Sequence, residues 1–239
     1  AQAFCHVPIH LAANSCDFFI AGCHKWLGAY HPLGLAFYGH PRSRGYIERA
    51  AGEDATLVVF PEAFVPGYPA WIWRLRPGSD WDITEQIHAR LLANAVNLEG
   101  DDLATIRAAA REHAVTVILG LNERDGALSQ ATLYNTVVII GADGSILNRH
   151  RKLMPTNPER MVWGFGDGSG LKVVDTPAGR IGTLLCWENY MPAARMAIYA
   201  KGVELYLAPT ADQRDTWQAT LRHIACEGRC FVLSSNQYV

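Results

Sequence analysis

Residues 182–192 read GTLLCWENYMP, and this stretch decides the fold class. The apolar residues before Cys186 predict a strand, from residue 181 to 185, that is buried on both faces and runs straight into the thiol. Residues 192–201 then predict a helix. Functional groups in α/β proteins collect just beyond strand ends, so this stretch indicates an α/β fold with Cys186 as a candidate functional residue.

Strand and helix patterns alternate on both sides of this stretch. Asp101 and Asp102 are expected to cap the helix at 103–114, and Ala142-Asp143-Gly144 is a hairpin signal. The remaining expected strands are 56–60, 115–121, 133–140, 145–150, 203–208 and 231–235, with a further helix at 213–227. Together these patterns predict a layered α/β domain with a mixed sheet.

Composition narrows the classes of function. A formal net charge of −2 in 239 residues argues against a nucleic-acid or membrane partner bound through bulk charge. The sequence has no apolar run of about 18 residues and no signal-peptide pattern at its start. Six cysteines without a repeating spacing favour reduced thiols and a cytoplasmic location.

Residues 1–46 differ in composition from the rest of the chain. They contain 4 charged side chains and five of the nine histidines, whereas the other 193 residues contain 40 charged side chains. Proline, glycine and charge interrupt the apolar pattern near Gly45. We therefore expect two unlike segments, 1–46 and 47–239.

Three polar residues follow buried strands, namely Glu62, Lys152 and Cys186. A thiol attacks as its thiolate, so Cys186 needs a base, and a poorly solvated Glu62 could accept its proton. Lys152 could hold both groups in register and stabilise developing negative charge. This combination suggests hydrolysis of a carbon–nitrogen bond, although from position alone a buried cysteine and solvated caps or ion pairs are the commoner explanation.

The surrounding motifs strengthen the first interpretation. LVVFPEAFVPGYPAW (57–71), NRHRKLMPTNPERMVWGFGDGS (148–169) and GTLLCWENYMP (182–192) together resemble the nitrilase superfamily, in that family's order. The resemblance covers residues 47–239 and implies an α-β-β-α sandwich that is incomplete at both ends. It also implies a homo-oligomer.

The resemblance assigns roles to individual residues. It implies Glu62 as general base, Lys152 as electrostatic stabiliser, Cys186 as nucleophile and Glu159 as a supporting glutamate. Trp187 and Tyr68 would line the substrate pocket, or else pack as ordinary aromatic side chains. The implied reaction converts a nitrile to a carboxylic acid and ammonia without cofactor or metal; amide release, amidase activity and a catalytically silent or partner-dependent fragment are the alternatives.

Residues 1–46 resemble another family. The opening Ala-Gln, the strand expected at 17–21, and His24-Lys25-Trp26 followed by Pro32-Leu33-Gly34 are similar to the pyridoxal-lysine segment of class V aminotransferases. By that resemblance Lys25 would form a Schiff base, but the aspartate expected just before Ala-Gln is not in this sequence, which disfavours such catalysis. The strand could instead pair at a sheet edge.

Two other patterns are candidates for ligand sites. His223, Cys226 and Cys230 could share a helix face, for which a buried apolar stripe is the preferred explanation over zinc. The glycine-rich residues 164–169 precede a strand rather than opening a helix, so they are not expected to bind phosphate.

Overall fold

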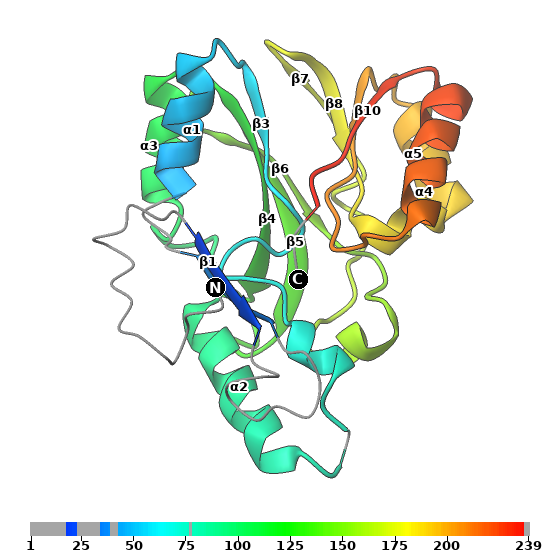
Figure 1. Cartoon of the computed structure of the whole chain (residues 1–239). Coiled ribbons are helices and arrows are strands. Elements are labelled where there is room, and N and C mark those ends of the chain that lie inside the picture. Colours follow the sequence, from blue (N-terminus) through cyan, green and yellow to red (C-terminus); the bar gives the residue numbers. More distant parts are fainter. Residues whose placement is uncertain (1–17, 23–33, 39–42, 77, 237–239) are drawn as a thin grey trace.

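The computed structural model describes residues 18–22, 34–38, 43–76 and 78–236, and their architecture is an α-β-β-α sandwich (Figure 1). Two four-stranded sheets face each other, in the orders β3-β4-β5-β6 and β10-β9-β8-β7. The strands of the first sheet are β3 (Leu57–Val59), β4 (Thr116–Arg124), β5 (Leu133–Ile140) and β6 (Ile146–Arg151). Those of the second are β7 (Val173–Thr176), β8 (Gly179–Thr183), β9 (Leu205–Leu207) and β10 (Phe231–Leu233). The predicted α/β sandwich is confirmed.

Helices cover the outer face of each sheet. Helices α1 (Ser43–Gly52) and α3 (Ala104–Glu112) lie on the first sheet, and α4 (Pro192–Tyr199) and α5 (Asp215–Gly228) lie on the second (Figure 1). A further helix, α2 (Trp81–Asn94), lies away from both sheets and presents only Leu91 as a buried residue. Its weak apolar periodicity explains why the sequence pattern did not predict it.

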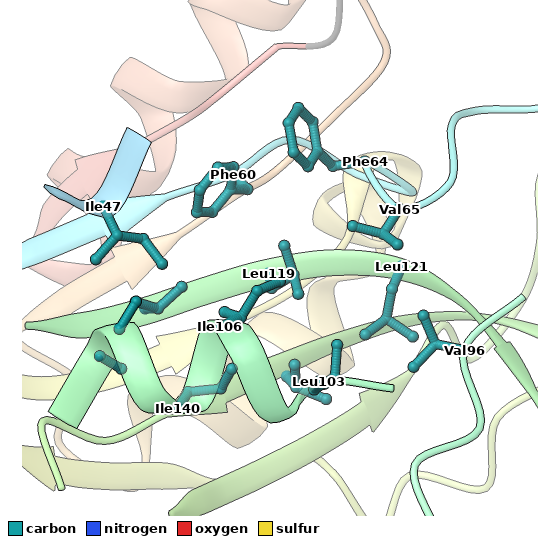
Figure 2. Close-up of a cluster of buried hydrophobic side chains, with 14 of the residues drawn as sticks. Ile47, Phe60, Phe64, Val65, Val96, Leu103, Ile106, Leu119, Leu121 and Ile140 are labelled. Atoms are coloured by element: carbon teal, nitrogen blue, oxygen red, sulfur yellow. The ribbon is translucent and has the colours of Figure 1, made fainter. Parts of the chain in front are cut away.

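The alternation of side chains along the strands builds three apolar layers. On β4, Leu119 and Leu121 point to the side of the sheet that α1 and α3 cover and belong to one apolar cluster with Ile47 and Ile106 (Figure 2). Ile118, the residue before Leu119, points to the opposite face of the strand and belongs to the cluster between the two sheets. Both faces of the strand are therefore buried, as the continuous apolar run predicts.

The pairing within each sheet is mixed. Strand β3 is parallel to β4, whereas β4, β5 and β6 form antiparallel pairs. Strands β8, β9 and β10 are parallel, and β7 is antiparallel to β8. The hairpin predicted at Ala142-Asp143-Gly144 is confirmed, with Gly144 at a positive φ of 80°.

Three expectations need correction. The regular strand before Cys186 ends at Thr183, two residues short of the expected Leu185, because the chain begins to turn into the short helix that opens at Cys186. Leu103 occupies the N-cap of α3, since the Asp102 carboxylate instead accepts a hydrogen bond from the Asn97 amide. Strand β1 (Phe18–Gly22) pairs with β2 (Gly34–Tyr38) in a sheet of its own, not with an edge of a four-stranded sheet.

The proposed division of the chain at residues 46 and 47 stays a prediction. Helix α1 passes through the expected junction near Gly45, and Ile47 is fully buried in the core. Lys25 and most of the segment that resembles an aminotransferase lie outside the described residues. None of the described helices is long and apolar enough to cross a membrane.

Candidate active site

Glu62 lies on a loop that leaves the first sheet and returns to it. The Phe60 amide still bonds to Ile118 of β4, and the Val65 amide bonds to Gly120, so the chain between them arches over the strand. Ala63, with a φ of 49°, turns the backbone at the crest. The Glu62 side chain is thereby placed, fully buried, within the protein.

Gly120 makes this arch possible. A Cβ atom at that position would lie 2.1 Å from the Pro61 carbonyl oxygen and 2.8 Å from the Glu62 Cα atom. Only glycine allows the two backbones to approach this closely. The glycine in the otherwise apolar run of residues 115–121 is therefore a requirement of the site.

Lys152 joins Glu62 and Glu159 into one buried cluster. Its Nζ atom donates to Glu62 Oε1 at 2.7 Å and to Glu159 Oε2 at 2.8 Å. The lysine follows β6, and its backbone amide extends the ladder by bonding to the Asn135 carbonyl. A lysine ammonium has three donors, so a third hydrogen remains beyond these two bonds within the described part of the chain.

Burial and charge compete within this cluster. Burial raises the pKa of Glu62 above its usual value, and the neighbouring Lys152 charge only partly opposes that rise. Burial by itself would lower the pKa of Lys152, but Glu62, Cys186 and Glu159 outweigh it, so the net pKa is raised. The lysine is thus held as a cation, while Glu62 is poised to take up a proton.

Cys186 opens the short helix η4 (Cys186–Tyr190) with a left-handed backbone, at a φ of 48°. Its amide bonds to the Pro209 carbonyl, which continues the β8–β9 pairing beyond both strand ends. Such a conformation is uncommon for a residue with a side chain and is concentrated at functional sites. The backbone at Cys186 therefore agrees with the motif in marking this residue as functional.

The thiol is electrostatically coupled to the cluster. Burial raises the pKa of Cys186 to about 12, Glu62 adds to the rise, and Lys152 opposes it. The resting group is therefore a thiol at neutral pH, and a nearby base must take its proton during attack. Glu62, with its raised pKa, fits that requirement.

A cavity of about 490 Å³ lies against Cys186 and Glu159. It is lined by Cys186, Glu159, Tyr68 and Trp187 among others, so both aromatic residues predicted for the substrate pocket are present there. Tyr68 also donates to Glu159 Oε1 at 2.6 Å and packs edge-on against Trp163. The structure therefore brings all six predicted site residues together.

Several supporting groups were missed by sequence reasoning. The Asn135 amide donates to Glu62 Oε1 at 2.8 Å, and the Ala211 backbone amide donates to Glu62 Oε2 at 2.9 Å. The signal for Asn135 was a polar residue inside the apolar run 133–140. A backbone donor such as Ala211 leaves no signal in the sequence.

The structure places the two other candidate ligand patterns on α5 and beside β6. His223 and Cys226 are exposed on α5, so the buried stripe expected there is wrong; Trp217 and Ile224 form the buried face. Among the described residues, no group of three or more His, Cys, Asp or Glu side chains could hold a metal ion. The glycine-rich loop packs on β6, where a Cβ at Gly166 would lie 2.2 Å from the Arg151 carbonyl oxygen.

A two-sheet sandwich that brings a cysteine, a lysine and two glutamates into one site is suited to hydrolysis by a thiol nucleophile. The sequence model of the carbon-nitrogen hydrolase family matches residues 36–239. The chain belongs to the carbon-nitrogen hydrolase family.

Curated relatives support the same placement. A bifunctional nitrilase/nitrile hydratase from Nicotiana tabacum is 46% identical over 207 residues, which cover 84% of this chain and 58% of the relative. An aliphatic nitrilase from Sinorhizobium fredii is 48% identical over 194 residues, covering 81% and 61%. The chain thus spans about three fifths of the length of these relatives.

Solved structures share the fold. The yeast protein Nit3, a member of the nitrilase superfamily, superposes with a TM-score of 0.66 at 23% identity, over 82% of this chain and 68% of that one. An amidase from Nesterenkonia with acrylamide added to its active-site cysteine gives a TM-score of 0.61 at 19% identity, over 82% and 70%. At these identities the likeness concerns the fold alone.

Proposed function

We propose that this chain carries the catalytic apparatus of a nitrilase, which converts a nitrile to a carboxylic acid and ammonia through Cys186. The observation that carries the proposal is the buried Lys152 ammonium, bridging Glu62 at 2.7 Å and Glu159 at 2.8 Å next to the cavity that Cys186 lines. Relatives at 46–48% identity that are named nitrilases support a nitrile as substrate.

The first half of the reaction forms a covalent intermediate. The Cys186 sulfur adds to the nitrile carbon, one carbon–nitrogen π bond breaks, and the nitrogen takes a proton, giving a thioimidate. Glu62 accepts the thiol proton and passes it on to the nitrogen. The remaining hydrogen of Lys152 is suited to stabilise the negative charge that develops on that nitrogen.

The second half consumes two water molecules. Glu62 removes a proton from the first water, which adds to the thioimidate carbon, and ammonia leaves to give a thioester. A second water cleaves the thioester, releases the carboxylic acid and returns the thiol. If the first tetrahedral intermediate expels the thiol instead, an amide is released after one water, the outcome that the hydratase part of the Nicotiana relative's name describes for that protein.

Ammonia release from a panel of aliphatic and aromatic nitriles and amides tests the proposal. Wild-type chain should release ammonia from nitriles, and Cys186→Ala should release none. Mass spectrometry of the products separates acid from amide. A folded wild-type chain that releases no ammonia from any nitrile and forms no amide would refute the proposal.

One observation favours a partner-dependent form of this activity. On β10, Phe231 pairs with Leu205 and Leu233 pairs with Leu207, so both side chains share the face that Leu207 turns towards the core between the sheets. Phe231 is nevertheless 76% exposed and Leu233 39% exposed. An apolar face of this kind invites a partner or aggregation, and activity that rises with protein concentration would support the former.

The remaining expectations are proposals of the same kind. We expect a homo-oligomer in the cytoplasm, which size-exclusion chromatography and cell fractionation would test. The aminotransferase resemblance stays a prediction and has no support from the family match, which already begins at residue 36. Visible absorption after addition of pyridoxal phosphate, lost in Lys25→Ala, would support it.

A further inference from the structure

Glu188, two residues after Cys186, makes an unusual set of contacts for a buried carboxylate. It is fully buried in η4. Its Oε2 atom accepts from the Leu185 amide at 2.8 Å, and its Oε1 atom accepts from the Leu153 amide at 2.5 Å. His150 Nε2 lies 3.0 Å and 3.1 Å from the two oxygens.

These contacts join the two segments that carry the reacting groups. Leu185 immediately precedes Cys186 on the second sheet, whereas Leu153 immediately follows Lys152 on the first. His150 lies in β6, two residues before Lys152. One carboxylate therefore fastens the cysteine turn to the lysine segment across the sandwich.

The groups around Glu188 show which atoms donate hydrogen bonds and which atoms accept them. Both backbone partners are N–H groups, so Glu188 must accept with both oxygens, and His150 must carry its hydrogen on Nε2. His150 Nδ1 is buried without a hydrogen-bond partner among the described residues. The contact of His150 with Glu188 is therefore made through an Nε2–H donor.

We infer that Glu188 is a positioning residue that sets the register between Cys186 and Lys152. This inference rests on the proposed function, because it assumes that the two groups act on one substrate. Glu188 does not line the cavity of about 490 Å³, so it acts through the backbone rather than by touching substrate. A displacement of about 1 Å at a reacting group can lower the rate about 100-fold.

Glu188→Gln tests the inference with little change in shape. A glutamine has one accepting oxygen, so whichever way its amide turns, its NH₂ group faces either the Leu185 or the Leu153 amide hydrogen. The matched control is Glu123→Gln. Glu123 is also buried and bonds to Arg151, next to Lys152, but its other partners, Thr136 and Arg149, lie in the same sheet.

The readout is the rate of Cys186 alkylation by iodoacetamide, located by peptide mass spectrometry and divided by that of the exposed Cys226 in the same molecule. Glu188→Gln should lower this ratio by about 10- to 100-fold. It should lower kcat for a nitrile, expressed per Cys186 that can still be alkylated, by a similar factor with little change in KM. Glu123→Gln should leave both within about twofold.

An unchanged or raised alkylation ratio in Glu188→Gln would overturn the inference, even if the variant unfolds at a lower temperature.

If Glu188→Gln does not fold, His150→Leu removes one donor and keeps the two backbone contacts. It should lower the ratio by about 3- to 10-fold, corresponding to loss of one hydrogen bond; no change would overturn the inference. A wild-type chain inert towards nitriles would refute the proposed function, and the alkylation ratio would still decide the role of Glu188.

Discussion

Lys152 and Glu62 form an ion pair of 2.7 Å in which neither side chain is accessible to water. A buried pair is costly to desolvate and contributes little net stability when compared with apolar residues of the same volume. Its presence between two sheets, beside a second carboxylate and a thiol, is therefore better explained by chemistry than by folding.

Glu62 should control the acidic side of the pH–activity profile. A general base must be ionised, and burial raises the pKa of Glu62 above the usual 4.5. Activity should therefore be lost as pH falls through a midpoint above 4.5, measured as kcat/KM on a nitrile. Glu62→Gln should lose about 10²- to 10⁴-fold in rate; a wild-type midpoint at or below the usual value would contradict the assignment.

Lys152→Met should abolish activity and destabilise the protein. Methionine keeps the length of the side chain but leaves Glu62 and Glu159 buried together without a cation. Breaking a buried pair in this way costs about 3–5 kcal/mol, which urea denaturation measures. The exposed Lys172 provides a matched substitution, Lys172→Met, which should stay within about 0.5 kcal/mol of wild type. Equal stability of the two variants would count against the buried cluster.

Cys186 should make stability decline at alkaline pH. Its pKa is about 12 in the folded chain against an ordinary 9.0, so the folded state retains a proton that the unfolded state releases. The stabilising contribution is complete below the ordinary pKa and is lost as pH rises through this window. The difference in unfolding free energy between wild type and Cys186→Ala should shrink from about pH 8 to pH 11. If this difference in unfolding free energy did not change with pH, folding would not raise the pKa of the Cys186 thiol.

Gly120→Ala should damage the site although residue 120 touches no substrate. The new Cβ would lie 2.1 Å from the Pro61 carbonyl oxygen, so the Glu62 arch must shift. We expect a loss of about 1–3 kcal/mol in stability and a larger proportional loss in kcat than in KM. Gly45→Ala in α1 meets no atom within 4 Å and should be neutral or stabilising by about 0.5–1 kcal/mol. Similar kinetics for the two variants would contradict the proposed packing.

The parts of the fold that rest on local pattern were predictable. The apolar runs that became β4 and β5 stand out because both faces are buried, and the hairpin is marked by its turn residues. Glu62, Lys152 and Cys186 were identified by their position after such runs and by the motifs around them. Whether a residue follows the end of a strand is a local property, so it can be predicted from the residues around it.

The relationships across the sandwich were not predictable. The contacts of Glu188 with Leu153 and His150 join residues 35 and 38 positions apart. Their register depends on how two sheets pack, which no periodicity encodes. The arch over Gly120 was missed for the same reason, since a glycine in a strand does not show which backbone will approach it.

The most direct test of the central claim is intact-mass and peptide-mass labelling of the chain with an electrophilic nitrile analogue. Cys186 should be labelled faster than Cys226 or Cys230, and Glu62→Gln should remove this advantage while the protein stays folded. Labelling of Cys186 no faster than that of the exposed Cys226 would contradict an activated nucleophile at this position.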